Sequence, residues 1–131
     1  MRTIEEKILD RLNSDSKGVY QLSCRDRVNI DDTSKEYYLW HNRIYFRKNG
    51  MEHFCFCNWT SVTTKSRLNA LVKAGYFYQK NWKIYFKLSS TNKTYLIDTS
   101  KTYAIDNIGG FLLERVSYDD KYKEVEEVEV K

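Results

Sequence analysis

Three potential metal ligands, His53, Cys55 and Cys57, alternate along one short segment of the chain. If this segment is a strand, its period of two places all three on one face and the intervening phenylalanines on the other. Imidazole and thiolate are preferred zinc ligands, and His41 could supply a fourth. Alternate strand residues lie about 6 to 7 Å apart, however, which suits a tetrahedral site less well than a tight Cys-x-x-Cys turn. We therefore expect packed, reduced cysteines without a disulfide or a bound metal.

Other catalytic signatures are weak. A nucleophilic Cys55 would need a base beside it, and His53 is the only histidine nearby in sequence. Metal-dependent phosphoryl transfer gathers several carboxylates, whereas residues 41–97 contain a single acid. Gly109-Gly110 lacks both the following lysine and the third glycine of a phosphate-binding loop. The sequence predicts a protein that is not an enzyme and has no cofactor, and a metal-binding or cysteine enzyme is the third alternative.

Basic residues are concentrated in the middle of the chain. Residues 1–40 carry 7 basic and 8 acidic side chains, residues 41–97 carry 10 and 1, and residues 98–131 carry 5 and 9. The middle block therefore has a net charge of 10 − 1 = +9. Such a block predicts a positive surface that attracts a polyanion or an acidic protein face, although a solvated lysine-rich surface has the same composition.

The strongest local pattern joins a predicted basic helix to a basic hairpin. Hydroxyl groups and helix N-terminal amides hold phosphates, while arginine and asparagine have the donor geometry to read base edges. We predict nucleic-acid-binding residues on this helix, on the hairpin that follows it and on the preceding strand: Arg43, Arg47, Lys65, Arg67, Asn69, Lys73, Lys80, Lys83, Tyr85 and Lys87.

Aromatic residues are interspersed with these charges, among them Tyr76, Tyr78, Trp82 and Tyr85. If exposed, they can stack on bases while the lysines neutralise phosphates, as in proteins that bind single strands. If buried, they are the core of a sheet with polar tips. For Trp59 and Trp82 we expect the buried position.

Two helices are expected. Thr3 and Glu6 form a capping box, and apolar residues recur on one helical face, which predicts a helix over residues 4–13. A second helix is expected over residues 63–74, with Gly75 as its stop. The second helix should bury Leu68, Leu71 and Val72 against the sheet. It should expose Lys65 and Lys73 to solvent.

For most of the remaining chain, the residue pattern predicts short strands. Asn49-Gly50 is the dipeptide of a type I′ hairpin, and Lys80-Asn81 marks a second short turn. The expected strands cover residues 19–22, 37–40, 43–48, 51–59, 76–79, 82–88, 94–98, 102–105 and 111–118. The polar residues 24–36 predict a surface loop.

These elements predict a single domain of the α+β class, with two short helices and antiparallel hairpins, over residues 1–118. The charged residues 119–131 predict an acidic C-terminal tail, frayed or dependent on a partner. No apolar run is long enough for a membrane span, and no export signal is found. Three cysteines are too few for a secreted disulfide scaffold, so we expect a reducing cytoplasm, that of the bacterial host for a phage protein.

The helix and hairpin together resemble half of a winged helix, although the preceding residues 51–59 predict a strand where that fold has a helix. The stretch from Trp59 to Phe86 is also similar to a motif in small uncharacterised proteins of bacteriophages and plasmids. It includes Trp59-Thr60, the run from Thr63 to Asn69, and Gln79-Lys80-Asn81-Trp82. This resemblance implies a mobile-element origin and no particular reaction.

The function that the sequence favours is binding of nucleic acid, DNA in particular, or of a nucleoprotein complex through the basic helix and hairpin. The alternative is a protein-binding inhibitor of a host defence enzyme, similar to anti-CRISPR proteins. The acidic tail supports this alternative because it can imitate nucleic acid or pair with a basic partner. The oligomeric state is open.

Overall fold

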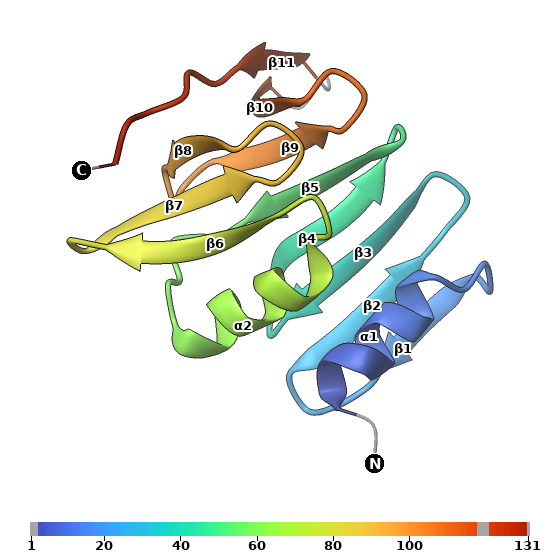
Figure 1. Cartoon of the computed structure of the whole chain (residues 1–131). Coiled ribbons are helices and arrows are strands. Elements are labelled where there is room, and N and C mark those ends of the chain that lie inside the picture. The colour runs from blue at the N-terminus through green and yellow to red at the C-terminus, as the bar shows by residue number, and fades with distance from the viewer. Residues whose placement is uncertain (1–2, 118–120, 131) are drawn as a thin grey trace.

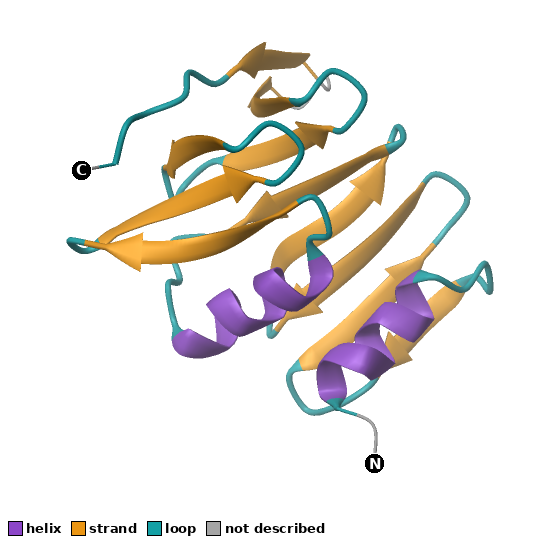
Figure 2. Ribbon diagram, in the orientation of Figure 1, coloured by secondary structure: helices purple, strands orange, loops and turns teal. Residues whose placement is uncertain are grey.

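The computed structural model describes residues 3–117 and 121–130. Within these ranges it contains two helices and eleven strands, so the α+β fold is dominated by strands (Figure 2). The helices are α1 (Ile4–Leu12) and α2 (Val62–Leu71). The strands are β1 (Gly18–Gln21), β2 (Asp26–Ile30), β3 (Ser34–Leu39), β4 (Asn42–Lys48), β5 (Met51–Cys55), β6 (Gly75–Lys80), β7 (Lys83–Leu88), β8 (Lys93–Ile97), β9 (Thr102–Asp106), β10 (Phe111–Ser117) and β11 (Lys121–Glu124).

The strands form two antiparallel sheets. Eight strands pair in the order β1-β2-β3-β4-β5-β9-β10-β11, and β6, β7 and β8 form a separate three-stranded sheet. Both helices and the three-stranded sheet lie on one face of the large sheet (Figure 1). None of the described helices has the length and apolar composition of a membrane span.

The core fills the space between the large sheet and the layer that covers it. Phe54 of β5 meets Phe77 of β6 and Phe86 of β7, with ring centroids 4.7 and 5.4 Å apart. Ile8 of α1 and Leu68 of α2 are completely buried in the same core. Burial of these apolar side chains holds the three-stranded sheet and the helices against the large sheet.

The predicted helices are confirmed, with shorter bounds. Thr3 caps α1 by accepting a hydrogen bond from the Glu6 amide, and Ser61 caps α2 by accepting one from Thr64. Leu68, Leu71 and Val72 are buried as expected. Lys73 is exposed, whereas Lys65 is only half-exposed. Gly75 does not stop α2 but begins β6, where a Cβ would collide with the Lys87 carbonyl and the Phe86 ring.

The two predicted hairpins are present. Asn49 and Gly50 have φ values of 56° and 73°, as a type I′ turn requires. In the second hairpin the turn residues are Asn81 and Trp82, one position later than predicted, with φ values of 51° and 68°.

The loop predicted over residues 24–36 is wrong, because β2 and the start of β3 lie within it. In β2 the inward side chains are Asp26, Val28 and Ile30. The alternation of buried and exposed residues in β2 was not recognised in the sequence because one inward residue, Asp26, is an acid. Its charge is neutralised by Arg67, which is distant in the sequence.

The expected acidic tail is ordered where the structure describes it. Lys121–Glu124 form β11 on the edge of the large sheet. The Val125 amide then donates to Leu112 of β10, and the Val128 amide donates to Thr94 of β8, at 2.9 and 2.8 Å. The segment after β11 thus spans from the large sheet to the small one. Residues 119, 120 and 131 of the predicted tail lie outside the described residues.

The resemblance to a winged helix does not extend to the arrangement of elements. The element before α2 is β5, and no helix-turn-helix unit occurs in residues 3–117 and 121–130. What remains of the expectation is a short helix followed by a two-stranded hairpin.

Candidate functional site

The outer face of the β6–β7 hairpin combines tyrosines and lysines. In the register of the two strands Tyr76 pairs with Lys87, Tyr78 with Tyr85, and Lys80 with Lys83. Residues between them, such as Phe77 and Phe86, are buried in the core, so strand alternation sends the paired residues outward. We call this surface the tyrosine–lysine face: Tyr76, Tyr78, Lys80, Lys83, Tyr85 and Lys87.

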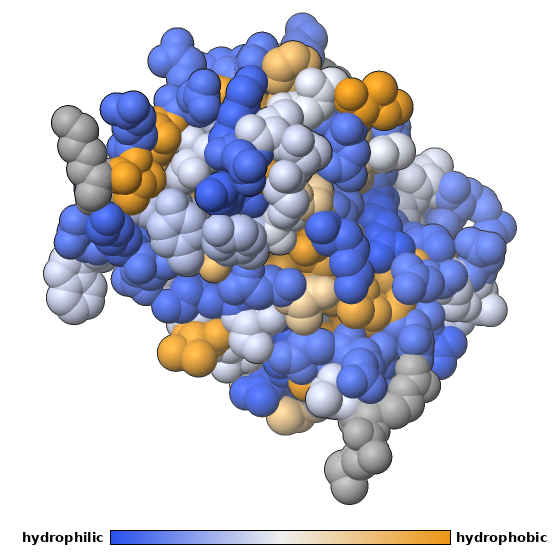
Figure 3. Space-filling model, viewed as in Figure 1, coloured by the Kyte–Doolittle hydropathy of each residue, from blue (hydrophilic) through white to orange (hydrophobic). Residues whose placement is uncertain are grey.

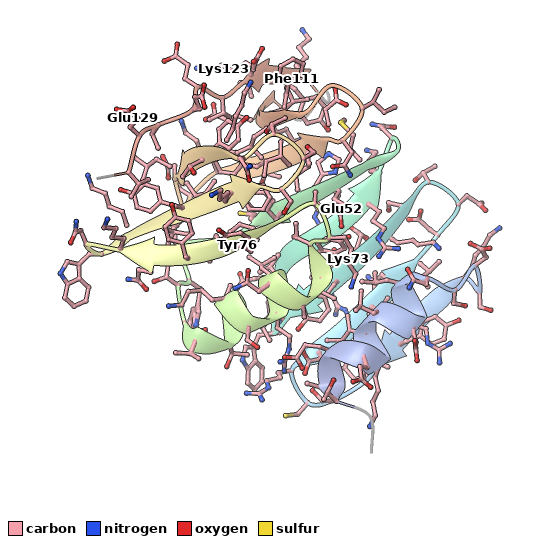
Figure 4. All side chains as sticks on the ribbon, in the orientation of Figure 1. Glu52, Lys73, Tyr76, Phe111, Lys123 and Glu129 are labelled. Atoms are coloured by element: carbon pink, nitrogen blue, oxygen red, sulfur yellow. The ribbon has the colours of Figure 1, made fainter. Side chains whose placement is uncertain are left out.

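The three tyrosine rings form a continuous aromatic row. The rings of Tyr78 and Tyr85 are stacked with centroids 5.5 Å apart, and those of Tyr76 and Tyr78 are 6.0 Å apart and tilted. Tyr76 extends from β6 and is 48% exposed (Figure 4). A planar ring can therefore extend this row at Tyr76.

The lysines of the face are not neutralised by carboxylates of the described chain. No ion pair joins a described acidic side chain to Lys80, Lys83 or Lys87. Lys65 of α2 contacts the other side of β6, because its Nζ donates at 2.8 Å to Oε1 of Gln79, which alternates with Tyr78 and Lys80. The face therefore carries positive charge beside exposed aromatic rings.

Trp82 occupies the tip of the hairpin. It is 93% exposed, and Trp59 is 57% exposed, so the prediction that both are buried is wrong. Trp82 also has a φ of 68°, a left-handed conformation that disfavours a bulky side chain. The turn forces both residues at its centre to positive φ, and the tip extends beyond any surface that could cover the indole. A strained, exposed tryptophan is a feature typical of a binding site.

A cleft of about 670 Å³ adjoins the tip of the hairpin and is lined in part by Trp82 and Lys83. Its far wall carries an ion pair between Lys101 and Glu114, with Nζ and Oε1 3.0 Å apart. Asp98 lines it as well, so the charges in the cleft are balanced.

Arg67 does not belong to any exposed surface, contrary to the prediction. It is buried, with Nε 3.0 Å from Oδ1 of Asp26 and Nη1 3.2 Å from Oε1 of Glu5. Burial alone would raise the pKa of Asp26, but hydrogen bonds from Arg67, Ser23 and Tyr37 outweigh it and hold that pKa below its usual range. Arg67 thus joins α2 to β2 and α1.

Three further predicted site residues hold the fold together. Asn69 donates to the Phe77 carbonyl and accepts from the Phe77 amide, at 3.2 and 2.7 Å, which satisfies the free edge of β6. Arg43 pairs with Glu36 at 2.7 Å, within the large sheet. Arg47 donates to the side chain of Asn13 and to the Leu12 carbonyl at the end of α1. Their polar groups are therefore engaged in contacts within the fold.

The remaining predicted residues separate into two groups. Lys80, Lys83, Tyr85 and Lys87 lie together on the tyrosine–lysine face. Lys73 lies apart from them, beside Glu52, whose carboxylate accepts from the Lys73 amide (Figure 4). Tyr76 and Tyr78, which the sequence indicated could stack on bases if exposed, lie on the same face but were not in the list of predicted binding residues.

The candidate metal ligands do not form a metal site. Both His53 ring nitrogens have partners, the Met51 carbonyl at 3.2 Å and the Tyr122 hydroxyl at 2.7 Å. Within residues 3–117 and 121–130, no group of three or more His, Cys, Asp or Glu side chains is placed to hold a metal ion. Cys55 and Cys57 are free thiols whose sulfurs are only 3.4 Å apart, so the wide separation expected between them is wrong.

Seen from the side that carries the helices and the small sheet, the surface is mostly hydrophilic, with apolar residues in small groups (Figure 3). An extensive apolar docking surface is not seen on this side.

Comparison with known proteins places the chain in a phage family. The family model described as Kyanoviridae Gp96 protein matches residues 1–107, which include both helices and the whole tyrosine–lysine face. No curated protein matches the chain, and no solved structure matches it. Because the match spans well over half of its length, the chain belongs to the Kyanoviridae Gp96 protein family.

Proposed function

We propose that this phage protein binds single-stranded nucleic acid on the tyrosine–lysine face, and that it acts by binding rather than by catalysis. The observation that carries the proposal is that one exposed sheet face has both a row of tyrosine rings and lysines without acidic partners among the described residues. Sequence-tolerant binding of single strands uses this combination, because every base has a π-face and every nucleotide a phosphate.

The contacts of α2 argue against a role for this helix in recognising base edges of double-stranded DNA. Recognition helices use arginine and asparagine donors to read base edges in the major groove. Here the Arg67 guanidinium is buried against Asp26 and Glu5, and the Asn69 amide is bound to β6. With those donors occupied, the hairpin is the better candidate for contact with nucleic acid, and stacking is its better means of contact.

Charge reversal tests the proposal. A variant with Lys80→Glu, Lys83→Glu and Lys87→Glu should lose binding to single-stranded DNA and RNA oligonucleotides in fluorescence anisotropy at low salt. The matched control reverses three exposed lysines outside the face, Lys7, Lys17 and Lys123, and so changes the net charge equally. Equal loss in the two variants would show a non-specific charge effect, and an unbound wild-type protein at low salt would refute the proposal.

The exposure of Trp82 supports a second candidate, an inhibitor that occupies a host protein. Tryptophan and tyrosine are the residues that most often dominate the energy of protein interfaces, and the hairpin carries both on its outside. Such an inhibitor would show little free binding to nucleic acid. It would instead form a tight complex with one host protein whose affinity depends weakly on salt.

A further inference from the structure

A pair of thiols lies where β5 ends. Sγ of Cys57 is 3.4 Å from Sγ of Cys55. Strand alternation does not produce this contact, because Cys57 follows the end of β5 and has a φ of 53°. Asn58 is also left-handed, at 60°. The backbone turns back on itself at these two residues and brings the second sulfur onto the first.

Hydrogen bonds on both sides hold this turn in place. The Asn58 amide donates to the Thr99 carbonyl, and the Trp59 amide donates to the Phe56 carbonyl, both at 2.9 Å. The Cys57 thiol is also 3.6 Å from the Arg43 carbonyl of β4. The two sulfurs are therefore held in contact by the backbone, and not only by their own attraction.

The groups around Cys55 favour its thiolate. The Cys57 thiol faces its sulfur, and the Cys57 amide donates to it at 3.1 Å. The hydrogen bond from Cys57, together with Thr102 and the positive charge of Arg43, outweighs burial and lowers the pKa of Cys55 to about 6. The same hydrogen bond raises the pKa of Cys57, which keeps its proton. One thiolate and one thiol in contact are the two partners that disulfide formation needs.

We propose that Cys55 and Cys57 form a dithiol site that reacts with hydrogen peroxide. The Cys55 thiolate attacks one peroxide oxygen, and the O–O bond breaks. The sulfur becomes a sulfenic acid, and the other oxygen leaves as hydroxide, which takes a proton to become water. The Cys57 sulfur then attacks the sulfenic sulfur, so that the S–S bond forms and the S–O bond breaks. The Cys57 proton leaves with that oxygen as a second water, so two thiols are oxidised and one peroxide is reduced.

The burial of the pair selects a small oxidant. Cys55 is buried and Cys57 half-buried, so a protein disulfide has poor access to the reacting thiolate. Cys24 is exposed, in the turn between β1 and β2, and would complicate any measurement by forming disulfides between molecules. The proposal does not depend on binding of nucleic acid.

The test uses the full chain with Cys24→Ser. One equivalent of hydrogen peroxide should remove two hydrogen atoms from the intact mass and link Cys55 to Cys57 in a peptide map. Adding Cys57→Ser should stop the reaction at a sulfenic acid that dimedone traps on Cys55, and adding Cys55→Ser should abolish that adduct. If both thiols of the Cys24→Ser protein are still alkylated by iodoacetamide after peroxide treatment, the proposal is wrong.

The dependence of the rate on pH gives a second readout that needs no further variant. The reaction rate of the Cys24→Ser protein should rise through about pH 6 and level off above it, because the Cys55 thiolate is then fully formed. An unstructured peptide with one cysteine, whose ordinary pKa is about 8.5, should still gain rate above pH 8. Identical profiles for the protein and the peptide would overturn the assignment of Cys55 as the reacting thiolate.

Discussion

The guanidinium of Arg67 is enclosed by two carboxylates from different parts of the chain. Glu5 comes from α1 and Asp26 from β2, while Arg67 itself lies in the middle of α2. The Tyr37 hydroxyl from β3 donates to the same Asp26 carboxylate. A buried charge is tolerated only where it is paired and hydrogen-bonded, so this cluster depends on all its members.

Arg67→Ala is expected to lower the free energy of unfolding by about 3 to 5 kcal/mol, because it leaves the Asp26 carboxylate buried and uncompensated. Urea denaturation followed by circular dichroism measures this loss. The double variant Asp26→Asn/Arg67→Ala should lose less, since the fully buried position 26 is then neutral and only the partly exposed Glu5 loses its partner. Lys35→Ala, which removes a surface ion pair with Asp15, is the control and should change stability little. A double variant less stable than Arg67→Ala would contradict the prediction.

Trp82 represents the opposite case, a large apolar residue placed in solvent at an unfavourable φ. Trp82→Gly should leave the stability almost unchanged, because the relief of a left-handed conformation offsets the added freedom of the unfolded chain. If the indole stacks on a base, the variant should bind single strands about 5- to 150-fold more weakly, corresponding to about 1 to 3 kcal/mol. Fluorescence anisotropy measures the affinity.

Trp40→Gly is the matched control for this variant. Trp40 also has a positive φ, 56°, and is 53% exposed, but it lies at the β3–β4 turn of the other sheet. Its replacement should not weaken binding. If both variants reduce the affinity equally, Trp82 has no special part in the interface.

At the scale of elements, α2 is held by its ends and by one apolar side. Its first turn is capped by Ser61, and Asn69 near its other end satisfies the edge of β6. Leu68 and Leu71 are completely buried against the sheet layer. The helix therefore supports the hairpin that carries the tyrosine–lysine face, and a defect in its packing should reach that face through β6.

Leu71→Ala is expected to lower the free energy of unfolding by about 2 to 5 kcal/mol, through lost burial and the cavity that remains. Val62→Ala in the same helix serves as the control, because Val62 is exposed and its truncation should cost less than about 0.5 kcal/mol. Thermal and urea denaturation both report the difference. An unchanged melting temperature for Leu71→Ala would show that this side of α2 is not packed in solution.

At the scale of the molecule, the charges of the chain are separated in space. The basic side chains of the small sheet point outward from β6 and β7, whereas the acidic segment after β11 runs along the far edge of β8. Glu124, Glu126 and Glu127 border a hollow beside Lys93 there. The acidic segment therefore lies at the β8 edge of the three-stranded sheet, whereas the lysines of the tyrosine–lysine face lie on β6 and β7.

Binding of single strands should depend on salt in a defined way. If Lys80, Lys83 and Lys87 each neutralise one phosphate, log affinity should fall with log salt at a slope of about −2, taking about 0.7 per phosphate. Titrations at several salt concentrations measure the slope. The Lys83→Glu variant should show a flatter slope, while Lys123→Glu should not change it. A steep slope that persists without Lys80, Lys83 and Lys87 would place the phosphates elsewhere.

Much of the local structure was determined by the sequence itself. Asn49-Gly50 sets its turn because both residues tolerate positive φ, and Thr3 begins α1 because its hydroxyl satisfies a backbone amide. The burial of Leu71 followed from helical periodicity. These features depend on neighbours within a few residues, so sequence patterns suffice for them.

The tertiary structure decided which polar and aromatic residues lie on the tyrosine–lysine face and which do not. Arg67 is not part of the predicted surface because it is paired in the core with Asp26, which is 41 residues away. The inward position of that acid is also the reason why the sequence predicted a loop where β2 lies. Trp82 remained in solvent because a shift of one residue put it at the tip of the turn. The sulfurs of Cys55 and Cys57 met because the backbone leaves the strand between them. Burial, pairing and turn position depend on partners that are distant in sequence, and their effects outweigh local preference.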